Sequence, residues 1–140
     1  MKVKDFAKAL GNFMDCGEND YRVAFNRIFT NTKKQLDYES FVIDSLADIG
    51  HSSNVVCFRL EENKEHNGMK VEDLFKVFND IKNKKSECFD YGEFEVELKH
   101  SYCDGTDAYW GFCVDVYHAS EVCVDICSES KEIGFSIDLE

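Results

Sequence analysis

The sequence of this chain contains the same opening twice, and this repetition constrains its fold more than any other feature. Residues 1–13 read MKVKDFAKALGNF and residues 69–81 read MKVEDLFKVFNDI, with five of the thirteen positions identical. Apolar residues recur at i, i+3, i+4 and i+7 in both segments, which predicts two amphipathic helices. The rest of the chain must therefore supply an apolar surface that covers both helices.

The similarity continues beyond the two helices in the same order. Short segments that alternate apolar with polar or small residues follow each helix, and this pattern predicts strands. We interpret the chain as a duplication, with repeats at 1–68 and 69–140 that together form one domain, because neither repeat is large enough for a core of its own. The matching segments are YRVAF (21–25) with FEVEL (94–98), YESFVIDSL (38–46) with YWGFCVDVY (109–117), and FRLE (58–61) with IDLE (137–140).

The fold class follows from the order of these elements. Short connections between alternating segments favour antiparallel hairpins. We expect an α+β fold in which two tandem αβββ-type repeats form one pseudo-twofold domain, with an antiparallel sheet and both helices packed on one face. The second repeat has room for one strand more. The expected strands are 21–29, 37–46 and 54–62 in the first repeat, and 93–102, 109–118, 121–128 and 133–140 in the second.

The net charge of −12 is confined to the end of the chain. Residues 1–85 contain 14 acidic and 14 basic side chains, whereas residues 86–140 contain 14 acids and only two bases, Lys99 and Lys131. Such an asymmetry bears on partners rather than on fold. It excludes direct binding of nucleic-acid phosphates by the C-terminal region.

A hairpin over 109–128 with its turn near Ser120 would bury Val114 and Val116 against Ile126 and Val124. On its other face this register places Asp115 opposite Asp125 and Cys113 opposite Cys127. These groups could hold a cation or form a disulfide. Zinc sites usually recruit more Cys or His at tighter spacing, and disulfides are rare in a reducing cytosol, so a solvated face is favoured.

Seven outward positions of the predicted strands in the second repeat are acidic, and Lys99 is the only base among the outward positions. Solvated sheets usually mix charges, because like charges on neighbouring strands repel. A basic partner would explain the excess, and the alternative is an acidic surface that only keeps the protein soluble. The predicted partner-binding residues are Glu93, Glu95, Glu97, Asp115, Asp125, Asp138 and Glu140.

Catalytic, metal and cofactor signals are weak. The four histidines lie in no recognised nucleophile motif, and no glycine-rich phosphate loop is present. The loop CDGTDAY (103–109) contains Asp104 and Asp107 but lacks the spacing of a calcium loop. The seven cysteines include no C-x-x-C pair and are expected to be reduced thiols. We therefore predict no enzyme activity, no metal and no cofactor.

The sequence thus predicts a non-enzymatic acidic binding or inhibitor protein whose C-terminal sheet face docks on a basic protein surface. In concrete terms, it would be a phage-type inhibitor that mimics nucleic acid in the groove of a host defence nuclease, as an anti-CRISPR or anti-restriction protein does. The alternatives are an immunity protein that neutralises a cationic toxin, and a small ligand- or metal-binding domain. The sequence contains no long apolar run and no leader peptide, so a cytoplasmic location is expected. The sequence does not decide between a monomer and a homodimer.

Overall fold

The structure is a computed structural model that describes residues 1–103 and 112–140. Within these ranges, the side chains of 103, 112, 113 and 120–124 are not described. Asp104 and Asp107, in the loop that lacks the spacing of a calcium site, lie outside the described residues. The elements are α1 (Val3–Asp15), β1 (Arg22–Thr30), β2 (Leu36–Gly50), β3 (Val55–Glu62), α2 (Val71–Lys82), the 3-10 turn η1 (Tyr91–Glu93), β4 (Glu95–Cys103), β5 (Phe112–Cys127) and β6 (Glu132–Leu139).

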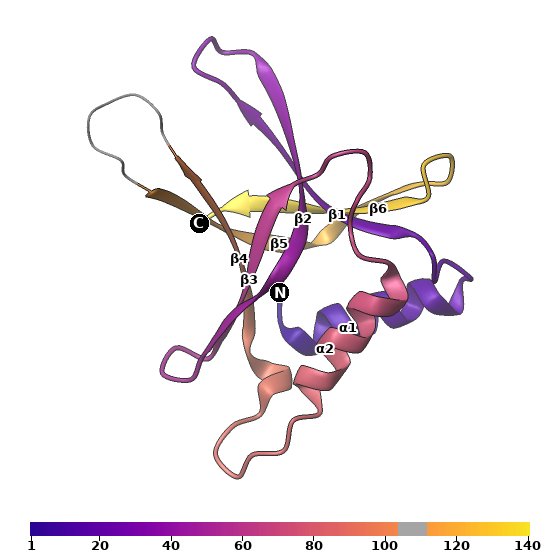
Figure 1. Ribbon diagram of the computed structural model, residues 1–140, viewed down its shortest axis with the longest axis vertical. Helices are drawn as coiled ribbons and strands as arrows, with labels where there is room; N and C mark the ends of the chain where they lie inside the picture. The colour runs from indigo at the N-terminus through magenta and orange to yellow at the C-terminus, as the bar shows by residue number, and fades with distance from the viewer. Residues whose placement is uncertain (104–111) are drawn as a thin grey trace.

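The two predicted helices are confirmed. Each helix buries one stripe of side chains: Phe6 and Leu10 are fully buried on α1, and Leu74 and Phe78 occupy the same stripe of α2. Figure 1 shows the helices side by side, on one side of the strands. Within the described residues, neither helix is long and apolar enough to cross a membrane.

The sheet closes into a barrel, which corrects the expected antiparallel sheet. The strands follow one another around the barrel in sequence order, from β1 to β6. Neighbours within each half pair antiparallel, whereas β3 pairs with β4 and β6 pairs with β1 in parallel. The parallel junctions join the two halves and could not be read from short-range hairpin patterns, because their strands are connected through a helix or lie at opposite ends of the chain.

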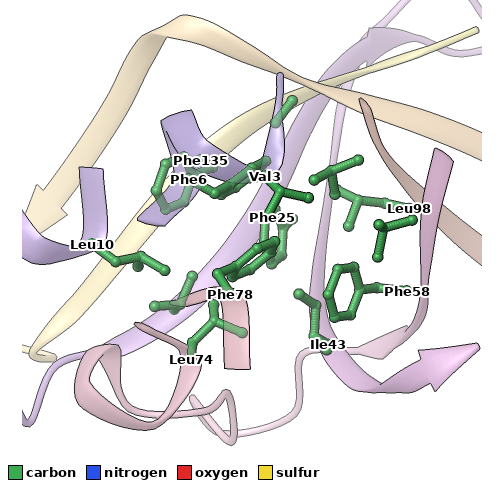
Figure 2. Close-up of a cluster of buried hydrophobic side chains, with 14 of the residues drawn as sticks. Val3, Phe6, Leu10, Phe25, Ile43, Phe58, Leu74, Phe78, Leu98 and Phe135 are labelled. Atoms are coloured by element: carbon green, nitrogen blue, oxygen red, sulfur yellow. The ribbon is translucent and has the colours of Figure 1, made fainter. Parts of the chain in front are cut away.

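The core fills the space between the helices and the inner face of the barrel. Figure 2 shows side chains from both helices directed toward phenylalanines on strands of both halves. Phe6 stacks on Phe78 at a centroid distance of 4.9 Å, and Phe78 contacts Phe58 at 4.9 Å. Phe25 and Phe135, on the parallel pair β1 and β6, stack at 5.8 Å. The helices therefore close one end of the barrel, and the strands continue beyond them to an opposite end that we call the mouth.

The repeated MKV segments tie each helix to the first strand of the other half. The N–H of Val3 donates to the carbonyl of Phe94 at 2.9 Å, and the N–H of Val71 donates to that of Tyr21 at 2.8 Å. Lys2 and Lys70 also form isolated bridges with Glu95 and Arg22. The repeated opening thus has the same structural role in both places. The reciprocal bonds run from the Val96 N–H to the Met1 carbonyl and from the Val23 N–H to the Met69 carbonyl.

The predicted hairpin over 109–128 is wrong. β5 is one continuous strand, so the second half contains three strands rather than four, and residues 109–111 of the expected strand lie outside the described residues. Asp115 pairs with His100 of β4, whereas Asp125 pairs with Gly134 of β6. The chain around Ser120 contains no Gly, Pro or Asn, and it passes through an irregularity in the β5–β6 register instead of turning.

The same error reversed the two faces of β5 in its first part, up to the irregularity after Ala119. Tyr117 and Ala119 point into the barrel and are buried, with Tyr117 only 1% exposed. Val114, predicted to be buried, lies on the outer face and is 51% exposed. Both alternating sets contain apolar residues, so the pattern alone did not decide between the faces, and a shift of one residue moves every side chain to the other face.

Candidate functional site

The seven predicted carboxylates lie in separate regions rather than on one face. Glu93 and Glu95 lie near the helical end, at the start of β4, and Glu97 follows on the outer face of that strand. Asp125 lies near the far end of β5 from the mouth. The remaining three lie around the mouth, where β5 begins and β6 ends: Asp115, Asp138 and Glu140.

The carboxylates at the start of β4 are compensated by positive groups. Glu93 accepts hydrogen bonds from the ammonium groups of Lys2, at 2.8 Å, and Lys4. Glu95 lies 3.2 Å from the amino group of Met1, and Glu97 lies 3.9 Å from Lys99. The contacts of Glu93 and Glu95 were missed because they join the start of the chain to residues about 90 positions away.

The ion pairs of Glu93 make the stability of the fold depend on pH. Hydrogen bonds from Lys2 and Lys4 lower the pKa of Glu93 from 4.5 to about 2. A carboxyl with a lower pKa in the folded state adds stability above its unfolded pKa and loses it as the pH falls through the folded value. We expect Glu93→Gln to lower Tm at pH 7, and the difference from wild type to vanish between about pH 5 and pH 2.

Thermal unfolding followed by circular dichroism from pH 7 to pH 2 measures this difference. Glu87→Gln is the matched control, because Glu87 is exposed and forms no ion pair with any described residue. If the Tm of Glu93→Gln differed from that of wild type by the same amount at every pH, the lysines would not stabilise the charged form of this carboxylate.

Two base–acid pairs occupy equivalent positions inside the mouth. Arg27 of β1 faces Glu39 of β2, and its Nη1 donates to the carboxylate at 3.3 Å. His100 of β4 faces Asp115 of β5 in the corresponding register of the other half. In both halves the pair lies two residues beyond an inward apolar pair, which is Phe25 with Phe41 in the first half and Leu98 with Tyr117 in the second.

Aromatic rings connect the two pairs across the barrel. The ring of Phe41 lies 4.7 Å from that of His100 and 5.6 Å from that of Tyr117. The Arg27 guanidinium lies 4.4 Å above the ring of Phe29 and 5.7 Å from that of Tyr117. These distances allow cation–π attraction and hold the guanidinium in place. The mouth is therefore filled by contacting side chains from both halves.

Tyr117 is held in its protonated form. Burial raises the pKa of Tyr117 to about 12, and the neighbouring carboxylates of Asp115 and Glu39 act in the same direction. Its hydroxyl donates to Asp115 at 3.3 Å. A phenol with this pKa does not supply a nucleophilic phenolate near neutral pH. Its role in the mouth is to pack and to donate a hydrogen bond.

Four carboxylates surround the mouth, and we call them the acidic rim: Glu62, Asp115, Asp138 and Glu140. None of them forms an ion pair with any described residue. Glu62, Asp138 and Glu140 are exposed, whereas Asp115 is half-buried beside His100. The sequence identified three of these four, and missed Glu62 because it lies in the half of the chain without net charge.

Metal ligands and reactive thiols were also sought among the described residues. They contain no cluster of three or more His, Cys, Asp or Glu side chains that could hold a metal ion. Cys57 is buried, and burial raises the pKa of its thiol, which makes it a weak nucleophile. The side chain of Cys113 lies outside the described residues, but the strand positions of Cys113 and Cys127 face Tyr102 and Glu132, not each other.

The side chains that fill the mouth were not selected from the sequence. Arg27 continues the inward alternation of Val23 and Phe25, and His100 continues that of Val96 and Leu98. These two residues could have been found from one feature of the sequence: a basic residue follows a run of alternating inward apolar residues. Such a base indicates an inward polar side chain at the place where the barrel opens to solvent.

Comparison with models of known protein families, with curated proteins and with solved structures finds no match to this chain. The functional argument therefore depends on the geometry and charge of the chain itself.

Proposed function

We propose that the protein is a non-enzymatic binding protein whose acidic rim docks on a basic protein surface. The observation that carries this proposal is the group of rim carboxylates, which have no cation partner among the described residues. An exposed carboxylate without a partner within the protein remains available to a lysine or arginine of another protein. The carboxylates at the start of β4 are paired internally, and we no longer expect them to lead the contact.

Nucleic-acid mimicry gives this proposal its most concrete form. The partner would be a nucleic-acid-binding enzyme, such as a host defence nuclease inhibited by a phage protein, whose groove presents Lys and Arg to phosphates. Carboxylates spaced around the mouth compete for the same basic groups. Long-range attraction between an acidic protein and a basic groove also raises the association rate. A cytoplasmic location is part of the proposal, because such an enzyme acts there.

We also infer that the two halves arose by duplication and are related by a pseudo-twofold axis through the mouth. Three equivalences support this inference: the helix–strand–strand–strand order, the MKV bonds into the opposite half, and the matched base–acid pairs. In this relation Asp115 corresponds to Glu39 rather than to Asp44, with which the sequence similarity had paired it. The halves therefore present like groups around one mouth.

The proposed docking predicts a charge-dependent association rate. Immobilised protein is used to capture a partner from cell extract, and the identified partner is then studied by surface plasmon resonance. Asp138→Asn with Glu140→Gln should slow association about tenfold at low ionic strength and flatten its salt dependence, because two attractive charges are removed from the contact. Duplex DNA should compete with the protein for the partner.

The matched control is Asp125→Asn with Glu129→Gln, which removes two exposed carboxylates of the same half far from the mouth. This variant should keep most of the wild-type rate. Equal slowing by both double variants would mean that only the total charge matters, and unchanged rates for the rim variant would remove the rim from the contact. Either result contradicts the proposal.

A further inference from the structure

The outer face of the β1–β2 hairpin exposes large apolar side chains. Ile28 is 73% exposed, Leu36 is 80% exposed and Tyr38 is 57% exposed. Ile28 pairs directly with Tyr38, and Leu36 pairs with Thr30 two positions further along, so all of them lie on the same face. Single exposed apolar residues are common on protein surfaces, but a contiguous group on one face indicates a contact surface.

This part of the hairpin extends beyond the barrel, as seen at the top of Figure 1. The parallel pairing of β1 with β6 ends at Asn26, and the pairing of β2 with β3 begins at Phe41. Among the described strands, residues 27–30 and 36–39 therefore pair only with each other. We call this two-stranded segment the ribbon. A ribbon of two strands has little core of its own, and packing on its apolar face would stabilise it.

Charge is distributed unevenly along the ribbon. Lys33 and Lys34 are exposed at its tip. Its base, at the end of β3 and in the following loop, contains Glu61, Glu62 and Glu65 against Lys64, all of them exposed. The apolar group of the ribbon thus lies between two exposed lysines at the tip and an excess of exposed acids at the base, which belong to β3 and the following loop.

We propose that a second copy of this chain covers the ribbon. Two ribbons packed face to face and antiparallel bring the apolar group of one copy onto that of the other. The same arrangement places the lysines at each tip over the acidic base of the partner, twice, about one twofold axis. Such a contact is closed, so it yields a dimer rather than a filament.

The charges and the apolar residues of the ribbon favour a second copy of the chain over a partner with a basic surface. The tip lysines oppose docking on a basic surface, whereas a second copy satisfies the lysines, the acidic base and the apolar group together. The acidic rim lies outside the packed faces, apart from Glu62 at the margin of the base. The variants that test the dimer leave all four rim carboxylates unchanged, Glu62 included, and they are tested on the purified protein alone, so failure of the dimer is distinguishable from failure of the proposed function.

The first test removes the apolar group. Ile28→Thr, Leu36→Thr and Tyr38→Thr are combined, because threonine keeps a high strand propensity. The control combines Val114→Thr with Ile126→Thr, two side chains that are each 51% exposed elsewhere. Sedimentation equilibrium from about 1 to 500 µM covers the range in which small interfaces dissociate. Wild type and control should dimerise and the triple variant should stay monomeric, whereas a monomeric wild type throughout this range overturns the proposal.

The second test exchanges charges and does not depend on the apolar group. Lys33→Glu with Lys34→Glu places acid over acid, and Glu61→Lys with Glu65→Lys places base over base, so each variant alone should be monomeric. An equimolar mixture of the two should form a heterodimer, because both tip-to-base contacts become attractive. Circular dichroism confirms that each variant is folded. Two variants that dimerise alone, or a mixture that stays monomeric, exclude the antiparallel arrangement.

Discussion

Replacing Phe78 with alanine is expected to lower the free energy of unfolding by about 3–5 kcal/mol, the cost of removing a buried aromatic ring and leaving a cavity. Phe78 lies at the centre of the core, between Phe6 of the other helix and Phe58 of β3. Its loss therefore weakens the contact of the helices with each other and with the barrel. Urea unfolding followed by circular dichroism measures the change.

Phe75→Ala provides the matched control on the same helix. Phe75 is only half-buried and lines the outer groove between α1 and α2, of about 600 Å³, together with Gly11. The same truncation there should cost clearly less, because solvent already reaches the ring. Equal losses for Phe75→Ala and Phe78→Ala would mean that the helices do not close the barrel as described.

The helices were predictable because their signal is local. The positions of Phe6 and Leu10, and of Leu74 and Phe78, repeat with helical spacing inside segments of thirteen residues. Their burial follows from the position of each side chain on the helix, and no distant part of the chain is needed to infer it. The repeated MKV opening was visible as well, but its bonds to Tyr21 and Phe94 were not.

Closure of the barrel was not predictable from the sequence, because both parallel junctions are non-local. Val23 pairs beside Ile133, more than one hundred residues away, and nothing in either strand indicates its partner. The course of β5 was missed for a different reason. Its two faces both contain apolar residues, so periodicity gave no preferred side, and the irregularity after Ala119 disturbs the alternation further.

The candidate site combines both kinds of information. Asp115, Asp138 and Glu140 were selected as outward acids of the predicted strands in the C-terminal half, and Asp115 was selected on a hairpin register that proved wrong. Arg27 and Glu39 were not selected, because an inward base and acid become recognisable only once the barrel and its mouth are known. The charge of the sequence therefore identified part of the rim, whereas the side chains that fill the mouth could be identified only from the fold.

Gly68→Ala is expected to destabilise the protein by about 2–3 kcal/mol, the cost of forcing a methyl group into closely packed surroundings. A Cβ atom on Gly68 would lie 2.2 Å from the carbonyl oxygen of Val23 and 3.1 Å from a methyl carbon of Val42. The obstacle is strand backbone, so the segment that carries Gly68 must move. That movement would also weaken the hydrogen bond from Arg22 to the Gly68 carbonyl, at 3.0 Å.

Thermal and urea unfolding of Gly68→Ala measure this cost. Gly11→Ala is the control, because it distinguishes the clash of a new methyl group with β1 from the general effect of replacing a glycine by alanine. Gly11 lies within α1, and a Cβ atom there meets only the edge of the Phe75 ring, at 3.4 Å. Alanine at this helical position should stabilise the protein by about 0.5–1 kcal/mol. The two substitutions are thus expected to have opposite signs. A Gly68→Ala protein as stable as wild type would show that the chain before α2 does not need its close approach to β1, and that the second MKV segment tolerates displacement.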